Sequence, residues 1–179
     1  MTYRSVAICL LAATALRMSI ETKASDELVA QLAMTTKSLV RITDTPHEMA
    51  DLTAALCRVP TEKPHSIHDG FLEPAFCHVY VSKDAEPAIR SGDSNYPVGA
   101  TIVKSKFARG KQDRPVLFTV MRKMQPGYDA NHGDWEYSIV DGLTRRVQAR
   151  GRIDSCIQCH ANYKKTGYVT REYMRPTGG

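Results

Sequence analysis

Two cysteines and one histidine stand close together near the carboxyl end of the chain, in the stretch SCIQCHA at residues 155–161. In a C-x-x-C-H pattern, two thiols can add to the two vinyl groups of a haem, and the adjacent histidine is then held under the iron as an axial ligand. The attachment point fixes where the cofactor lies, so the remaining chain has to fold around it. The pattern therefore predicts one covalent haem c per chain, bound through Cys156 and Cys159, with His160 as the ligand of the iron.

Two other kinds of site also use a C-x-x-C pair. A redox-active pair normally lies where a strand leads into a helix of a βαβ unit, and residues 150–152, RGR, give no sign of such a unit. A structural zinc site needs two further ligands at a matching spacing, and the sequence contains no second C-x-x-C. Both alternatives stay open, but the adjacent histidine favours haem attachment.

The first residues have the pattern of a secretory signal peptide. A short basic start, MTYR, is followed at residues 5–16 by a short apolar core, SVAICLLAATAL. Cleavage is expected after Ala15, at the end of an A-x-A-like triplet, or after Ala24. A buried N-terminal helix is the alternative interpretation of the same residues.

Removal of residues 1–24 would leave a single domain of residues 25–179, and we find no repeat or linker within it. We expect the mature protein in the periplasm or another exported location. Such a compartment is oxidising and permits disulfides, and it is where c-type haem is attached in bacteria. Signal and motif therefore support each other.

Composition excludes several classes of protein. The chain has 179 residues, of which 42% are hydrophobic and 24% charged, as in ordinary soluble domains. Its formal net charge is +5, but the basic residues are scattered, so the sequence does not indicate a nucleic-acid partner. No apolar run is long enough to span a bilayer as a helix of the mature chain.

The residues after the expected cleavage site predict two helices. Residues 25–27, SDE, can begin the first, and Thr45, Pro46 and Glu48 suit the cap and first turn of the second. The second helix is expected to end before Pro60. The expected buried positions are Leu28, Leu32, Thr35, Leu39 and Ile42 in the first helix, and Met49, Leu52, Ala55 and Leu56 in the second.

Four strands are predicted further along the chain, at residues 76–81, 100–107, 116–122 and 135–140. A short helical turn is expected at residues 86–90. Alternation in residues 100–107 puts Ile102, Lys104 and Lys106 on one face of the sheet and Thr101, Val103 and Ser105 on the other. The predicted fold is α+β: an antiparallel β-sheet preceded by two helices and followed by a short C-terminal segment that carries C-x-x-C-H.

Three stretches resemble the cytochrome P460 family. They are YPVGATIVK at residues 96–104, VMRKMQPGYDANHGDWEY at residues 120–137 and CIQCHANYKKTGYVTREY at residues 156–173. The specific part is a Gly-x-x-x-Val-Lys strand, then Gly-Asp-Trp, then a late haem motif. The resemblance runs from about Cys57 to Tyr173. It implies that residues 25–179 form one largely β haem domain of the P460 kind, which commonly pairs as a homodimer.

The resemblance also implies a role for Lys104. In P460 proteins a lysine on this strand is cross-linked to the haem edge in addition to the two thioethers, and the high-spin iron is open on its distal side. A lysine amine must lose its proton to attack a haem carbon, so it needs burial beside the ring. Lys106 on the same face is equally eligible by position.

The activity that the resemblance implies is the oxidation of hydroxylamine or a related small nitrogen species. The product is nitrous oxide when nitric oxide is the second nitrogen source, and electrons leave to a partner protein such as another cytochrome. Two alternatives stay open. The related cytochromes c′-β share the fold but lack the cross-link, and they bind nitric oxide or carbon monoxide without turnover. A simple electron carrier would need a sixth protein ligand, for which the sequence offers Met34, Met49, Met121, Met124, Met174, His47, His65, His68, His78 and His132.

Hydroxylamine oxidation needs a proton acceptor near the iron, and a carboxylate suits this role. A distal glutamate has the role in P460 enzymes, and the sequence departs from that pattern in the region that should supply it. Asp129, Asp134 and Glu136 are the candidates there, although aspartates beside glycine and asparagine also form turns. Cys57 and Cys77 can form a disulfide in an oxidising compartment; the alternative is two buried thiols.

Overall fold

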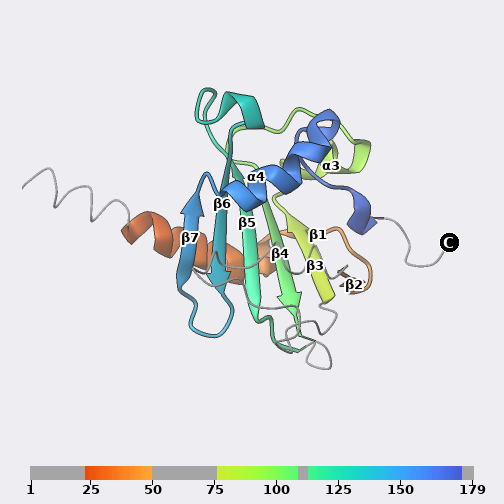
Figure 1. Cartoon of the computed structure of the whole chain (residues 1–179). Coiled ribbons are helices and arrows are strands. Elements are labelled where there is room, and N and C mark those ends of the chain that lie inside the picture. The colour runs from red at the N-terminus through yellow and green to blue at the C-terminus, as the bar shows by residue number, and fades with distance from the viewer. Residues whose placement is uncertain (1–22, 50–75, 109–112, 175–179) are drawn as a thin grey trace, which may run out of the picture.

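An antiparallel sheet lies at the centre of the computed structural model, which describes residues 23–49, 76–108 and 113–174. The described residues form seven strands, in the spatial order β1-β3-β4-β5-β6-β7, with β2 also paired to β3. Figure 1 shows the strands side by side, from β7 at one edge to β1 and β2 at the other. Their bounds are β1 Val40–Arg41, β2 His47–Glu48, β3 Phe76–Val81, β4 Thr101–Phe107, β5 Leu117–Lys123, β6 Trp135–Asp141 and β7 Val147–Gly151.

Short helices surround the sheet. An N-terminal helix is described over residues 23–34. The other elements are the α-helices α3 Glu86–Ser91 and α4 Asp154–His160, and the 3₁₀ helices η1 Thr36–Ser38, η2 Ala130–His132, η3 Ala161–Thr166 and η4 Glu172–Met174. Among the described residues, no helix is long and apolar enough to cross a membrane.

Strand register places Lys104 in the middle of the sheet. It lies opposite Val79 of β3 and Thr119 of β5, with hydrogen-bonded neighbours on both sides. Side chains alternate between the two faces of a strand, so Ile102 and Lys104 point to one face and Val103 to the other. The packing confirms this prediction, because Ile102 and Val103 belong to separate core clusters.

The back face of the sheet, as seen in Figure 1, is covered by the N-terminal helix. Val29, Ala30 and Ala33 of this helix form one apolar cluster with strand residues that point backwards. The strand residues in that cluster are Val103, Phe118, Val120 and Val140. Because a helix of this length is marginal by itself in water, its stability comes from this packing.

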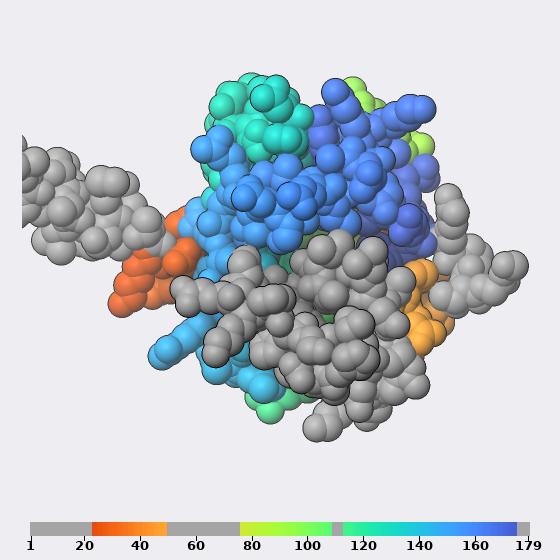
Figure 2. Space-filling model, viewed as in Figure 1, coloured from red at the N-terminus to blue at the C-terminus, as the bar shows by residue number. Residues whose placement is uncertain are grey.

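The front face is covered by the C-terminal segment. Ile153 before α4 and Val169 after η3 pack on front-facing strand residues such as Val79 and Ile139. Figure 2 shows α4 and the residues after it forming the front surface of the molecule, beside the turquoise loop that precedes β6. The sheet therefore lies between an N-terminal and a C-terminal layer.

The predicted α+β class and the four predicted strands are confirmed. The first helix is shorter than predicted, because the chain leaves it after residue 34 to pair β1 with the edge of β3. Its predicted buried face is wrong at Leu28, which is 43% exposed, and Val29, Ala30 and Ala33 are buried instead. Ile42 is buried as predicted, although it lies beyond the end of the helix.

The predicted start of the second helix is wrong as well. His47 and Glu48 form β2, opposite Cys77 and Phe76 of β3. Edge strands expose unpaired backbone groups, and pairing β2 to this edge satisfies some of them. The rest of that predicted helix falls in residues 50–75, which lie outside the described part of the chain. The strand β7 was not predicted.

Candidate functional site

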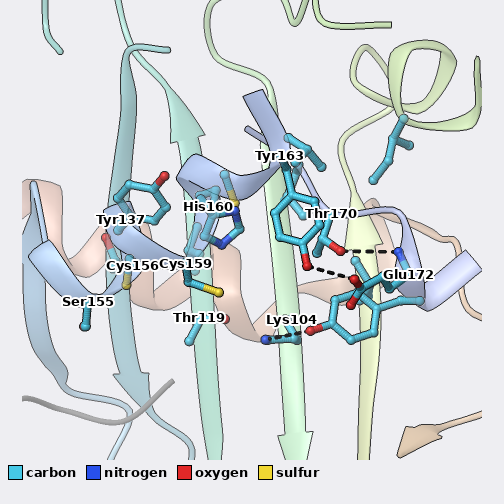
Figure 3. Close-up of a pocket in the computed structure, with 18 residues that line it drawn as sticks. Lys104, Thr119, Tyr137, Ser155, Cys156, Cys159, His160, Tyr163, Thr170 and Glu172 are labelled. Atoms are coloured by element: carbon cyan, nitrogen blue, oxygen red, sulfur yellow. Dashed lines mark hydrogen bonds between the residues drawn. The ribbon is translucent and has the colours of Figure 1, made fainter. Parts of the chain in front are cut away.

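The C-x-x-C-H motif lies on α4. Cys156, Cys159 and His160 are three and four residues apart, so a helix presents all three on one face. Figure 3 shows their side chains extending from α4 into the space in front of the sheet. The helix carries Asp154 in its first turn, where a negative charge interacts favourably with the helix dipole. Local helix geometry thus gathers the two thiols and the imidazole.

A pocket separates α4 from the sheet. It encloses about 870 Å³ of empty space when the part open to solvent is included. Its walls include the two motif cysteines and His160 on one side and apolar strand residues such as Val79, Ile102 and Met121 on the other. A large, mostly apolar group attached through both thiols fits these walls, as the predicted haem requires.

His160 has the protonation and the tautomer that an iron ligand needs. Burial lowers the pKa of His160 to about 4, so the imidazole is neutral at neutral pH. Its Nδ1 atom lies 2.7 Å from the carbonyl oxygen of Tyr168, which can only accept a hydrogen bond. Nδ1 therefore carries the proton, and Nε2 presents its lone pair to a metal.

Two tyrosines flank His160. The ring of Tyr137, from β6, is centred 5.4 Å from the imidazole, and the ring of Tyr163, from η3, is centred 6.4 Å from it. Tyr137 is buried, and its hydroxyl has no hydrogen-bond partner in the described part of the chain. Burial raises the pKa of Tyr137 far above the usual value for a phenol. Burial also raises the pKa of Tyr163, so both phenols are neutral at neutral pH.

Lys104 reaches the pocket from the strand side. Its Nζ donates a hydrogen bond of 3.2 Å to the hydroxyl of Tyr173 and lies 5.3 Å from the centre of that ring. Figure 3 shows the amine in the same space as Cys159 and His160. Lys106, equally eligible from sequence, is not among the described residues that line the pocket. The structure thus brings Lys104 together with both cysteines and His160.

Glu172 is the carboxylate that lines the pocket within the described residues. Its Oε1 accepts a hydrogen bond of 2.9 Å from the hydroxyl of Tyr163, and Figure 3 shows the pair at the end of the pocket away from Cys156. Sequence reasoning missed Glu172. The sequence feature that could have identified it is its position in residues 156–173, the stretch that begins with the haem motif and resembles the P460 family.

Asp129 and Asp134 are placed in the loop before β6, and neither lines the described pocket. Oδ1 of Asp134 accepts hydrogen bonds from the backbone N–H groups of Gly127 and Asp129, at 3.1 and 2.8 Å. The Asp129 carboxylate lies 2.9 Å from Nδ1 of His132. These contacts shape the loop, as turn-forming aspartates do.

Glu136 faces the back of the sheet, where its Oε1 lies 3.1 Å from Nε of Arg150. Arg150 also lies 3.2 Å from Asp26 of the N-terminal helix. Of the methionines proposed as a sixth ligand, Met121 is the one that lines the described pocket. Cys77 is buried in β3, and its proposed partner Cys57 lies outside the described residues, so the disulfide stays a prediction.

Comparison with known proteins agrees with the site. No curated protein matches the chain. A family model described as Cytochrome P460 matches residues 55–171, which is more than half of the chain and includes Lys104, the Gly-Asp-Trp sequence and the C-x-x-C-H motif. With thiols, imidazole and lysine gathered at one pocket, the chain belongs to the cytochrome P460 family of c-type haem proteins.

Proposed function

We propose that the protein is an exported mono-haem cytochrome that oxidises hydroxylamine or a related small nitrogen species at a high-spin haem with an open distal side. The observation that carries this proposal is the position of Lys104 in the pocket that Cys156, Cys159 and His160 also line. Neither attachment of a haem nor ligation of its iron requires a lysine amine in this pocket. Its presence supports the P460 type of chemistry over an ordinary cytochrome.

Cys156 and Cys159 would hold the cofactor through thioethers, and His160 would bind the iron through Nε2. When bound, the haem supplies a metal to which a small nitrogen ligand coordinates and a path by which its electrons leave. The protein residues supply attachment, orientation and proton transfer. The apolar walls limit the access of water to the ligand.

Tyr173 suits Lys104 in both of its protonation states. A phenol hydroxyl accepts a hydrogen bond from an ammonium group and donates one to a neutral amine. The amine can therefore lose its proton without losing this partner. A bond from Nζ to a ring carbon would replace one N–H and one C–H bond and release two protons and two electrons, so its formation would need a two-electron oxidant such as a peroxide.

Glu172 is the residue that we propose as proton acceptor, in place of the sequence candidates Asp129 and Asp134. Hydroxylamine loses protons together with electrons, and a general base must lie within reach of the pocket. Glu172 lines the pocket and is also exposed, so it can pass a proton to solvent. The Tyr163 hydroxyl orients its carboxylate.

Gas binding without turnover is the second candidate function. The pocket has apolar walls at Val79, Ile102 and Val169, which suit nitric oxide or carbon monoxide as well as a substrate. In that case Lys104 would not be joined to the haem. Export to the periplasm, a homodimer and a partner cytochrome complete the proposal; their support is the N-terminal sequence pattern and the family.

Replacement of Lys104 tests the proposal most directly. We expect the reduced wild-type holoprotein to show a red-shifted Soret band, and Lys104→Ala to show an ordinary high-spin band with the mass of one haem retained. Lys106→Ala is the matched control, because this neighbour lies on the same face of β4 and is expected to keep the wild-type spectrum. Hydroxylamine-dependent reduction of an electron acceptor should accompany the red-shifted band and be lost in Lys104→Ala.

The outcomes separate the candidates. Identical spectra for wild type and Lys104→Ala would remove Lys104 from its proposed role. An ordinary high-spin spectrum in the wild type, with gas binding but no hydroxylamine turnover, would support the second candidate. Sharp low-spin bands would indicate a sixth protein ligand and an electron carrier.

A further inference from the structure

The carbonyl that accepts the hydrogen bond from His160 belongs to an unusual turn. Gly167 and Tyr168 follow η3 and both have φ of +66°, in the left-handed region. Glycine adopts this conformation freely, but in a residue with a Cβ atom, such as tyrosine, it is strained. The turn directs the Tyr168 carbonyl to within 2.7 Å of Nδ1 of His160. Something outside the turn has to stabilise the strained tyrosine.

Trp135 is the first of these outside contacts. It lies at the start of β6 and is 1% exposed. Its Nε1–H donates a buried hydrogen bond of 2.8 Å to the carbonyl oxygen of Gly167, the residue before Tyr168. The peptide that leads into the left-handed tyrosine is thereby fixed to the sheet.

Gly133 is the second contact. A methyl-sized side chain at this position would lie 2.5 Å from Cδ2 of Tyr168, so the absence of a side chain makes room for the tyrosine ring. Gly133 itself has φ of +75°, which also favours glycine. Its carbonyl accepts a hydrogen bond of 2.8 Å from Nζ of Lys123, which fixes this part of the loop.

Asp134 acts through the loop that it closes. Its own φ is +53°. Its Oδ1 atom accepts hydrogen bonds from the backbone N–H groups of Gly127 and Asp129. The loop so formed presents the carbonyl of Asn131, to which the Tyr168 hydroxyl donates a hydrogen bond of 2.7 Å. The far end of the Tyr168 side chain is therefore held as well.

We propose that Gly133-Asp134-Trp135 positions the axial histidine: it holds the Gly167–Tyr168 turn so that the Tyr168 carbonyl accepts a hydrogen bond from Nδ1–H of His160. The inference rests on the proposed ligation of haem iron by His160. It gives a physical role to the Gly-Asp-Trp sequence, which ends 25 residues before His160 in the chain. None of the three residues is a catalytic residue, because they act through Tyr168.

A hydrogen bond to Nδ1 makes the imidazole a stronger donor to the metal. Weakening the bond should therefore lower the iron–histidine stretching frequency of the ferrous protein and raise the reduction potential of the haem. A residue that only stabilises the fold would lower the unfolding midpoint and leave both quantities unchanged. These two readouts separate positioning from stability.

Trp135→Phe and Tyr168→Phe are the test variants, prepared as holoprotein whose intact mass confirms one haem. The first removes the Nε1–H donor and keeps an aromatic ring; the second removes the hydroxyl that binds Asn131. Tyr96→Phe is the matched control: Tyr96 is buried, its ring is centred 5.3 Å from that of Trp135, and the change leaves the Gly167 hydrogen bond in place. We expect resonance Raman spectroscopy to give a lowered iron–histidine frequency in both test variants and the wild-type frequency in the control.

Asp134 provides a rescue experiment. Asparagine keeps the Oδ1 acceptor and tolerates a left-handed backbone, whereas alanine does neither. Asp134→Asn should therefore keep the wild-type frequency and potential, and Asp134→Ala should shift both in the same direction as Trp135→Phe. Equal iron–histidine frequencies and equal potentials in Asp134→Asn and Asp134→Ala would show that Asp134 does not help to position the turn.

The result also distinguishes this inference from the proposed function. A wild-type protein that lacks haem or an iron–histidine band overturns both. A normal wild-type band that stays unchanged in both test variants overturns this inference alone. If Trp135→Phe yields no folded holoprotein, Tyr168→Phe decides, because it keeps the ring and changes a partly exposed side chain.

Discussion

The two faces of the sheet are made by alternate residues of the same strands, yet they differ in kind. In β4, Val103 enters the tightly packed back cluster, while its neighbour Lys104 enters the pocket on the front. The back face is closed by apolar side chains from the N-terminal helix. The front face leaves room between the strands and the C-terminal segment. One strand thus contributes to the packed core and to the pocket through side chains one residue apart.

The difference in packing has a consequence for folding. The back cluster is complete with protein atoms alone, so its contribution to stability does not depend on a ligand. The front face gains further contacts when a cofactor fills the pocket, and a ligand that binds only the folded state stabilises it. Changes on the two faces should therefore affect different measured quantities.

Loss of the two thiols is the largest change on the front face. The double variant Cys156→Ala/Cys159→Ala should have the mass of the apoprotein after denaturing chromatography, because no thioether can form. Its unfolding midpoint should fall below that of the wild-type holoprotein, since bound cofactor no longer favours the folded state. Retention of covalent haem in this variant would contradict the assignment of the attachment site.

Phe118→Ala tests the back face. Truncation of a buried phenylalanine typically costs about 3–5 kcal/mol of the free energy of unfolding, and Phe118 is buried in the back cluster. Denaturant unfolding should show this loss, while the folded fraction keeps the wild-type haem content and absorption spectrum. A changed spectrum would mean that the two faces are coupled more strongly than their separate clusters indicate.

Glu172→Gln is the most local of the three changes. It removes the proposed proton acceptor and keeps the shape of the side chain, so we expect the proposed hydroxylamine oxidation to be about a hundredfold slower, with little change in the unfolding midpoint. Asp129→Asn is the comparison, because Asp129 was the sequence candidate for the same role. A large loss of rate in Asp129→Asn with normal turnover in Glu172→Gln would restore the sequence assignment and reject ours.

Much of the fold could be predicted from local patterns. The four central strands carry apolar and β-branched residues between turn residues, and alternation in β4 correctly separated Ile102 and Lys104 from Val103. The same rule, applied to β6, would have placed Glu136 on the back face, opposite to Trp135 and Tyr137. The alternation of residues along a strand thus predicts which face a side chain occupies better than its chemical type does.

Other elements could not be predicted, for physical reasons. The two-residue strands β1 and β2 are too short to show periodicity and depend on the exposed edge of β3. In β7, residues 147–151 read VQARG and lack the apolar alternation of the other strands. Glu172 could not be identified because its place in the pocket depends on how the segment after α4 turns back across the sheet.

The position of α4 bears on the order in which the sheet forms, haem is attached and the C-terminal segment docks. All seven described strands precede the motif helix in the chain, so the surface that faces the thiols can form before the C-terminal segment docks on it. In the folded structure, the sulfur atoms of Cys156 and Cys159 face the pocket. If haem is attached through these thiols as proposed, we expect the attachment to take place before the C-terminal segment docks on the sheet.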